Sequence, residues 1–314
     1  MRRAPLVPLV LLAVPATASA QAPTTPSAGA LKVSLTGTYH AGKQRIAFAG
    51  GTIGIRGAVA PPVEGEQVEV VIKRGRKTVR DKTVAVQNGG FQLAYKSRRA
   101  GTLTITAHHP ASANQVAMDA APLKVSLVRP RVHRGGRGIV VRFMQQQLGA
   151  LHYLVPTNGR YDAATGRAVL AYRKVNRMAR TMSADRTILL RLAAGRGAFR
   201  PRHPDAGKHV EADLGRQVLA LINPGGEVYK TLHMSSGKPS TPTVVGTFHF
   251  YMKEPGTNAK GMLDSNYFIR GYAIHGYPEV PNYAASHGCL RIPNANASFV
   301  FRWVGIGDRI DVYR

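Results

Sequence analysis

The chain has 314 residues, of which 44% are hydrophobic. This length exceeds one small domain, and the apolar share can fill real cores, so a wholly disordered chain is excluded. The formal net charge of +27 lies almost wholly in residues 1–208, which hold 33 Lys and Arg against 8 Asp and Glu, whereas residues 209–314 hold 10 against 8.

The first twenty residues predict an export signal. Arg2 and Arg3 form a positive start, Leu6 to Val14 form a short apolar run, and Ala18-Ser19-Ala20 is a small-residue cleavage site. The run is much shorter than the roughly 20 apolar residues that cross a bilayer, which argues against an uncleaved membrane span. No cysteine lies near the cleavage site. We therefore expect a secreted protein of the periplasm or cell wall, without a stable membrane span.

The basic excess predicts an anionic partner. Strongly basic proteins attract polyanions, and nucleic acid is the usual first expectation. Export argues against nucleic acid and favours anionic wall polymers, acidic lipid headgroups or peptide carboxylates, held by the basic N-terminal half. An arginine-rich composition that serves solubility alone is the alternative interpretation.

The segment after the signal is predicted to be β structure. Residues 21–30 are rich in Pro, Ser, Thr and Ala and predict a disordered linker. From residue 31 to 129, short runs that alternate apolar and polar residues are separated by turn signals roughly 8–12 residues apart, which is typical of an immunoglobulin-like β-sandwich. The runs include Val68 to Lys73, Thr83 to Val86, Phe91 to Tyr95 and Leu103 to Ala107.

Residues 130–200 change to helical periodicity. Apolar residues from Val140 to Leu148 predict one helix, and Asp162 is the expected N-cap of a second that runs to about Met178. A weaker third helix is expected near residues 187–192. The stretch from Gly159 to Val169 resembles the core of the small three-helix peptidoglycan-binding domain, although Tyr172 is followed by Arg173 where that motif has glutamine. The resemblance implies muropeptide binding; a plain helical linker is the alternative.

Residues 201–208 are rich in proline and charge and are predicted to form a linker. Residues 209–314 are predicted to form a mostly β domain. A hairpin is expected from Gln217–Ile222 and Val228–Leu232 around a Pro-Gly-Gly turn. Residues 247–253 alternate as one strand, and residues 272–274 form a strand that leads into His275. Asn294 is the expected cap of a short helix to about Val304, before a closing strand at residues 309–312.

The chain has a single cysteine, Cys289. In an exported protein a lone cysteine indicates an intermolecular disulfide or a reactive thiol. The alternative is a buried cysteine without a chemical role, which packs as a small apolar residue. Its neighbours favour reactivity, because imidazoles, cations and convergent amides lower the pKa of a thiol. Gly288 also permits a sharp turn that can build an oxyanion hole. The cluster is His275-Gly276-Tyr277-Pro278, then Ser286-His287-Gly288-Cys289-Leu290-Arg291.

A zinc site is the competing interpretation of this cluster. His275, His287 and Cys289, with His249, are residue types that ligate zinc. However, the sequence has no HExxH helix and no paired cysteines, and Arg291 beside the thiol would repel a cation. We therefore expect no metal and no other cofactor.

The pattern of this cluster resembles the signature of the L,D-transpeptidase catalytic domain. That signature is His-Gly, a stretch of about ten residues, and then Ser-His-Gly-Cys-hydrophobic-Arg. Ser235-Ser236-Gly237 and Thr241-Pro242-Thr243 also match the stretch before that family's central strand, as does the closing Gly307-Asp308-Arg309-Ile310. One departure is Val244-Val245, which separates Thr243 from Gly246 where members commonly place the glycine closer. The likeness covers about a third of the chain.

The resemblance implies a role for each matching position. Cys289 would be the nucleophile and His275 its general base, oriented by the backbone carbonyl of Gly276. The amides of His287, Gly288 and Cys289 would hold the oxyanion. Further positions are implied for substrate binding or support of the loop, namely Arg291, Ser286 and, beside the His-Gly pair, Tyr277.

The implied reaction forms 3→3 cross-links in peptidoglycan, with stem peptides and glycan strands as partners. An L,D-carboxypeptidase that passes the acyl group to water is the alternative, as is a non-catalytic protein that binds the cell wall. The whole chain is thus expected to be multidomain and mainly β. It would comprise a signal peptide (1–20), a linker (21–30), an Ig-like β-sandwich (31–129), a three-helix peptidoglycan-binding-like domain (130–200), a linker (201–208) and an L,D-transpeptidase catalytic domain (209–314).

Overall fold

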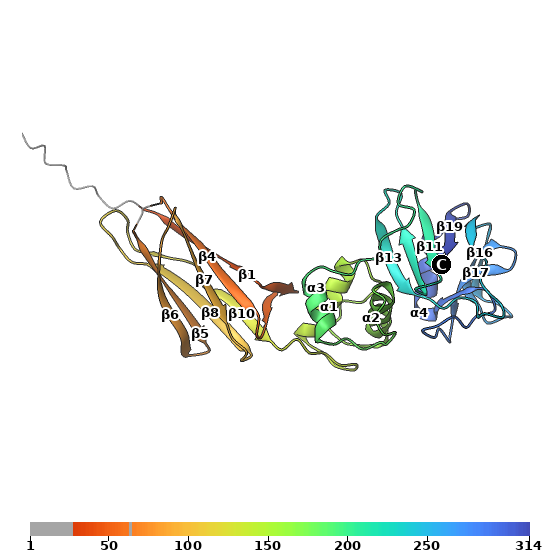
Figure 1. The fold of residues 1–314 in the computed structure, drawn as a ribbon, viewed down its shortest axis with the longest axis horizontal. Helices are drawn as coiled ribbons and strands as arrows, with labels where there is room; N and C mark the ends of the chain where they lie inside the picture. The colour runs from red at the N-terminus through yellow and green to blue at the C-terminus, as the bar shows by residue number, and fades with distance from the viewer. Residues whose placement is uncertain (1–27, 63–64) are drawn as a thin grey trace, which may run out of the picture.

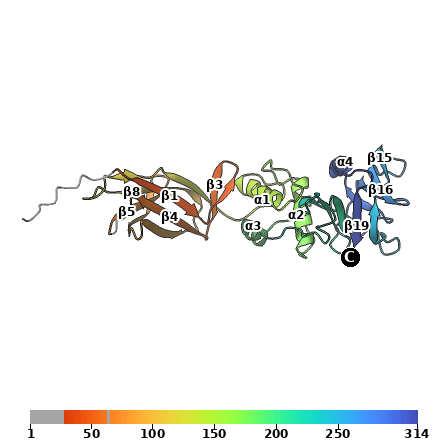
Figure 2. The same ribbon diagram turned by 90° about the horizontal axis from the view of Figure 1, so that it is seen from above.

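The computed structural model describes residues 28–62 and 65–314. The predicted signal peptide, and most of the linker predicted at 21–30, lie outside the described residues. The described part is mainly β, with four α-helices. Along the long axis of the molecule, a β-rich part is followed by a helical part and then by a second β-rich part that ends at the C-terminus (Figures 1 and 2). No helix in the described ranges is long and apolar enough to span a membrane.

Two sheets share one core in the N-terminal part. A three-stranded sheet has the order β1-β4-β7, and a larger one has the order β2-β3-β10-β8-β5-β6, with β9 paired to β8. Alternate residues of β5 and β4, such as Val70 and Ile55, are fully buried in the shared core. Assignment to the immunoglobulin-like type stays a prediction. The strands are β1 (Ala30–Thr36), β2 (Tyr39–Ala41), β3 (Gln44–Phe48), β4 (Thr52–Ala60), β5 (Gln67–Arg74), β6 (Lys77–Ala85), β7 (Gly90–Lys96), β8 (Gly101–His109), β9 (Met118–Asp119) and β10 (Leu123–Val128).

The edge strand β6 begins at Lys77, earlier than the start predicted at Thr83. Its first half carries Arg80, Asp81 and Lys82, all exposed. An edge strand with two polar faces has no apolar alternation, and charged side chains at such an edge discourage pairing with another chain. Val79 and Val84 both pack against the core, but the charged run between them hides this from the sequence, so only the C-terminal part of the strand was predicted.

Three helices follow: α1 (Ile139–Ala150), α2 (Ala163–Val175) and α3 (Arg186–Ala193). The predicted cap of α2 is present, because a carboxylate oxygen of Asp162 accepts from the Thr165 amide at 2.8 Å. The predicted end of α2 is wrong. The helix stops at Val175, and Arg177 then adopts a left-handed φ of 55°. The amides of Arg177 and Met178 turn back to the carbonyls of Lys174 and Arg173, which closes the helix end.

Two further sheets form the C-terminal part. One has the order β13-β12-β11-β19-β14 and the other β15-β16-β17-β18. The predicted hairpin is confirmed, since β12 pairs with β13. A core cluster that includes Leu219, Phe268 and Ile274 lies between the sheets. The elements are β11 (His209–Asp213), β12 (Val218–Ile222), β13 (Val228–His233), β14 (Gly246–His249), β15 (Met252–Thr257), β16 (Leu263–Ile269), β17 (Tyr272–Tyr277), β18 (Leu290–Pro293), α4 (Asn294–Trp303) and β19 (Arg309–Tyr313).

Two local predictions in this part are wrong. The single strand expected at residues 247–253 is two strands, β14 and β15, which belong to different sheets. Phe250 between them is buried, its amide donates to Asp308, and that of Tyr251 donates to Tyr267, so the chain crosses from one sheet to the other here. Asn294 is the first residue of α4 rather than its cap.

The helical part is joined to the five-stranded sheet by packing and by backbone hydrogen bonds. Val218 and Ala220 of β12 belong to the same buried cluster as α1, α2 and α3. The backbones of His152 and Leu154 exchange hydrogen bonds with Thr231 of β13, at 2.8 and 3.0 Å. The two parts therefore share a core, and removal of the helices would expose apolar residues of the sheet.

Candidate active site

Strands β17 and β18 bring the predicted residues together. They run parallel, and their register places His275 opposite Arg291. Cys289 directly precedes β18 and faces the same pocket as His275, which has a volume of about 370 Å³. Of the predicted site residues, all except Gly276 and Gly288 line this pocket. The lining residues are Lys260, Met262, Tyr267, Gly271, His275, Tyr277, Ser286, His287, Cys289 and Arg291.

Only glycine fits the position before the cysteine. Gly288 has a φ of +122°, and a Cβ there would lie 2.6 Å from the ring atom Cε1 of Tyr272. Both the left-handed backbone and the close ring exclude a larger residue. Gly276 has a similar steric role, because a Cβ there would lie 2.7 Å from the Cβ of Ala297 on α4.

The loop that carries Cys289 is fixed by hydroxyl groups. Ser286 Oγ donates to the Cys289 carbonyl at 2.6 Å and accepts from the Gly288 amide at 3.0 Å. Thr243 Oγ1 donates to the Gly288 carbonyl at 2.7 Å and accepts from the Gly237 amide at 2.9 Å. The Gly288 amide, one of the three predicted oxyanion donors, thus already donates to Ser286 Oγ.

His275 is held in one tautomer. Its Nδ1 lies 2.9 Å from the backbone carbonyl of Gly276, and because a carbonyl only accepts, Nδ1 carries the proton. Nε2 is then the unprotonated nitrogen. Burial lowers the pKa of His275, and nearby Arg291 lowers it further, while the Gly276 carbonyl opposes this. The imidazole is therefore neutral near pH 7 and able to accept a proton at Nε2.

Cys289 is a free thiol, partly buried. Burial raises its pKa, while the backbone of Ala273 and the positive charges of Arg291 and Lys260 lower it in part. Its Sγ lies 3.5 Å from the carbonyl oxygen of Gly271, a geometry in which the thiol donates. Both shifts favour the neutral forms of the thiol and of the imidazole, which line the same pocket.

Arg291 and Tyr277 form a stacked pair on one wall. The guanidinium carbon lies 3.9 Å from the centre of the Tyr277 ring, and that ring meets the His275 imidazole edge to face at 5.8 Å. The Nε of Arg291 is buried and has no hydrogen-bond partner in the described parts of the chain. The guanidinium thus contributes a positive charge, unpaired within the described ranges, to the wall of the pocket.

His287 lies at the pocket rim. Its Nε2 is 3.5 Å from the ammonium nitrogen of Lys238, which can only donate, so Nε2 acts as the acceptor. Of the histidines considered for zinc, His275 and His287 line the pocket with Cys289 and His249 does not. Across residues 28–62 and 65–314, no group of three or more His, Cys, Asp or Glu side chains is arranged to hold a metal ion.

Four lining residues were missed from the sequence: Lys260, Met262, Tyr267 and Gly271. They come from β16 and its flanking turns, which contain no motif. Tyr267 Oη donates to Glu254 at 2.7 Å, and Asn258 Nδ2 donates to the same carboxylate at 2.8 Å, which holds the turn that presents Lys260. The register between β15, β16 and β17 brings these residues to Cys289. No local sequence pattern indicates how strands so far apart in the chain pair, so these residues could not be predicted.

The helical part also contacts the loop before the cysteine. Arg180, just after α2, donates from Nη1 to the Asn282 carbonyl at 3.1 Å, and Asn282 Nδ2 donates to the Arg180 carbonyl at 2.7 Å. Lys174 Nζ lies 2.7 Å from His233 Nδ1, whose Nε2 donates to the Val280 carbonyl at 2.8 Å. Residues 280–282, on the approach to Cys289, are therefore positioned in part by the helical part.

Comparisons with known proteins agree with this geometry. A family model described as the L,D-transpeptidase catalytic domain, YkuD, matches residues 207–312. The L,D-transpeptidase 1 of Mycobacterium tuberculosis is 35% identical over 112 residues, which cover 29% of this chain and 45% of that protein. The chain thus spans less than half the length of the curated relatives it matches.

A solved structure extends the likeness beyond the catalytic domain. The crystal structure of an L,D-transpeptidase (residues 123–326) from Xylanimonas cellulosilytica has 32% sequence identity and a TM-score of 0.54, and the match covers 58% of this chain and 97% of that one. The chain belongs to the L,D-transpeptidase family, with residues 207–312 forming its catalytic domain.

Proposed function

We propose that this protein is an exported L,D-transpeptidase that forms 3→3 peptidoglycan cross-links through a thioester on Cys289. The observation that carries the proposal is the fixed tautomer of His275. The Gly276 carbonyl holds the proton on Nδ1, which leaves a basic Nε2 on the wall of the pocket that also contains the thiol. A neutral base beside a neutral thiol is the arrangement needed for general-base activation.

In the proposed acylation, Nε2 of His275 accepts the thiol proton as Sγ of Cys289 attacks. The electrophile is the carbonyl of the third residue, an L-centre, of a stem tetrapeptide. The new S–C bond forms, the C–N bond to the terminal D-amino acid breaks, and the imidazolium returns its proton to the leaving amine. The products are a thioester on Cys289 and a free D-amino acid.

In this proposal the amides of His287 and Cys289 stabilise the oxyanion, because the Gly288 amide already donates to Ser286 Oγ. Arg291 is assigned to a carboxylate of the stem peptide, because its guanidinium lines the pocket and forms no ion pair among the described residues. Lys260 supplies a second positive charge at the same pocket. Both cations favour an anionic substrate.

In the second half-reaction, the side-chain amine of a neighbouring stem attacks the thioester. His275 accepts a proton from that amine, the new amide forms, and the proton returns to Sγ as the thiolate leaves. The same intermediate attacked by water would give a shortened tripeptide stem and no cross-link. The acceptor therefore separates a transpeptidase from an L,D-carboxypeptidase.

The test is product analysis with defined disaccharide-tetrapeptides. The full chain should release the terminal D-amino acid and yield a cross-linked dimer, and Cys289→Ala should do neither. His275→Gln, which removes the base while retaining similar size, should retain the fold and lose at least about 100-fold in rate. Tripeptide without dimer would indicate the carboxypeptidase, and binding without release would indicate a wall-binding protein.

A further inference from the structure

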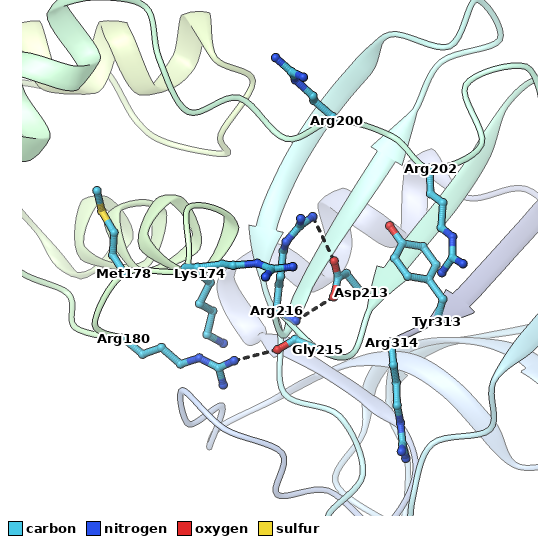
Figure 3. A pocket seen from close by; sticks show the side chains of 11 residues that line it. Lys174, Met178, Arg180, Arg200, Arg202, Asp213, Gly215, Arg216, Tyr313 and Arg314 are labelled. Carbon is cyan, nitrogen blue, oxygen red and sulfur yellow. Dashed lines mark hydrogen bonds and ion pairs between the residues drawn. The ribbon is translucent and has the colours of Figure 1, made fainter.

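A basic pocket of about 600 Å³ lies where the helical part meets the five-stranded sheet, outside the active site (Figure 3). Its walls come from three places: the C-terminal end of α2, the segment at 200–202, and the ends of β11 and β19. The lining residues are Lys174, Arg177, Met178, Arg180, Arg200, Arg202, Asp213, Gly215, Arg216, Tyr313 and Arg314. We call this the basic pocket.

The side chains of the basic pocket are strongly unbalanced in charge. Six of them are arginines, and Asp213 is the only acid among them. Its carboxylate is already paired, with Nη1 of Arg216 at 3.2 Å. Arg180 donates to the Gly215 and Asn282 carbonyls, and the Arg202 guanidinium lies 4.9 Å from the centre of the Tyr313 ring. None of these contacts adds a negative charge that would neutralise the remaining arginines.

Several donors in the basic pocket are unused. In the described parts of the chain, the guanidinium groups of Arg177, Arg200 and Arg314 have no hydrogen bond or ion pair. The Nε of Arg216 is buried and likewise has no acceptor. Guanidinium groups are planar, permanently charged and able to bind carboxylates and phosphates through two parallel hydrogen bonds. Together these donors suit a ligand with more than one negative charge.

Arg177 occupies a position that normally favours glycine. It follows α2 at the point where the helix closes, with a φ of 55°. A residue with a Cβ in this conformation costs stability relative to glycine, by about 1 kcal/mol. Arg177 is exposed, and in the described parts of the chain its side chain forms no hydrogen bond or ion pair. The guanidinium of Arg177 is therefore unpaired within the described chain, and it lies on the wall of the basic pocket.

The basic pocket continues toward the active site. A neighbouring pocket of about 510 Å³ shares Gly215 and Arg314 with it and is also lined by Lys238. The Lys238 ammonium lies 3.5 Å from Nε2 of His287, which lines the active-site pocket. The basic pocket thus adjoins the neighbouring pocket, and the Lys238–His287 contact connects that neighbouring pocket to the loop that carries Cys289.

We propose that the basic pocket binds the carboxylates of a peptidoglycan stem peptide carried by the strand on which the active site works. This inference rests on the proposed function, because it takes its ligand from that reaction. The stem peptide bears several carboxylates, which match the unpaired guanidinium groups. The apolar parts of Met178 and Tyr313 offer contacts to its side chains. The contact between Lys238, in the adjoining pocket, and His287, in the active-site pocket, favours a peptide of this strand over an unrelated polyanion.

Binding is tested in the full chain with Cys289→Ala, so that no turnover occurs. The probe is a fluorescent disaccharide-tetrapeptide, followed by anisotropy at low salt. Arg177→Gln with Arg200→Gln removes two guanidinium groups that have no protein partner. The matched control is Arg80→Gln with Lys82→Gln on β6, which removes the same charge from exposed positions of the far sheet. We expect the pocket variant to bind at least about fivefold more weakly, and the control to change less than about twofold.

A peptide with amidated carboxylates should bind the unsubstituted pocket as weakly as the normal peptide binds the pocket variant. Equal weakening in both double variants, or none in either, would overturn the proposal. So would poly(glycerol phosphate) that binds through Arg177 and Arg200 while the peptide does not, since the pocket would then serve a phosphodiester polymer. With Cys289 intact, both the unsubstituted chain and the pocket variant should form the thioester. If the unsubstituted chain forms no thioester, that result contradicts the proposed function and leaves the binding proposal standing.

Discussion

Arg180 and Asn282 exchange two hydrogen bonds across the junction between the helical part and the catalytic domain. Nη1 of Arg180 donates to the Asn282 carbonyl at 3.1 Å, and Nδ2 of Asn282 donates to the Arg180 carbonyl at 2.7 Å. Asn282 lies between β17, which carries His275, and Cys289. The helical part therefore helps to position Cys289 relative to His275.

Substitution Arg180→Ala should slow acylation of Cys289 by about tenfold while the protein stays folded. The lost contacts are charge-assisted hydrogen bonds to carbonyls, worth about 1.5–3 kcal/mol, and a small displacement of a nucleophile has large kinetic effects. Single-turnover thioester formation measures the rate. Arg186→Ala, an exposed arginine at the start of α3, is the matched control and should leave the rate unchanged. An equal effect in both variants would show that the loop does not depend on Arg180.

The buried pair of Lys174 and His233 should make stability rise with pH. Burial lowers the pKa of Lys174 to about 6, and burial together with Lys174 lowers that of His233 to about 3. Both bases then bind fewer protons in the folded state, Lys174 between pH 6 and its ordinary 10.5 and His233 between pH 3 and 6.5. Unfolding is therefore favoured as pH falls through these windows.

Substitution Lys174→Met tests this relation. The variant lowers stability overall, because it leaves the Gln217 and Met234 carbonyls without the donor now 3.0 Å away. The informative quantity is the slope of unfolding free energy against pH between 7 and 9, from urea titrations. We expect a shallower slope in the variant. An unchanged slope would mean that Lys174 titrates alike in the folded and unfolded chain.

The thiol should react slowly at neutral pH and faster in alkali. Burial raises the pKa of Cys289, and Arg291 and Lys260 reverse this only in part. The thiolate fraction of the free enzyme is thus small near pH 7. The rate of alkylation by iodoacetamide, measured by intact mass, should keep rising above pH 9. A plateau already reached at pH 6 would instead indicate a preformed thiolate–imidazolium pair.

Substitution Gly288→Ala should abolish activity. The added Cβ would lie 2.6 Å from the Tyr272 ring, in a backbone conformation with a φ of +122°. The loop must shift to relieve this contact, so we expect at least about a 100-fold loss of thioester formation. Gly149→Ala in α1 is the control, because its Cβ meets nothing closer than 3.9 Å and helical alanine stabilises by about 0.5–1 kcal/mol. Activity retained in Gly288→Ala would contradict the assigned role of this turn.

The sequence identified the candidate site around Cys289 because most of its residues are close together in the chain. Ser286 to Arg291 lie within six consecutive positions, and a glycine before a lone cysteine indicates a turn without any knowledge of the fold. Two apolar runs around a Pro-Gly-Gly turn likewise predicted the β12–β13 hairpin, and every residue of β12 is buried.

The parts that could not be predicted depend on contacts between distant segments. Residues 247–253 alternate like one strand, yet Phe250 marks a crossing between sheets that only the assembled core determines. Lys174 looks like an exposed helical lysine in sequence, but it is buried because α2 packs against β12 and β13. The end of α2 was missed because Arg177, rather than glycine, adopts the left-handed turn.

The most direct test of the account is the intact mass of the full chain after brief incubation with a defined tetrapeptide. The account predicts a gain equal to the stem without its terminal D-amino acid, located on Cys289, with one equivalent of that amino acid released. Cys289→Ala should show neither. Release of the D-amino acid by Cys289→Ala, or turnover by the unsubstituted chain with no adduct under rapid quenching, would contradict the thioester mechanism.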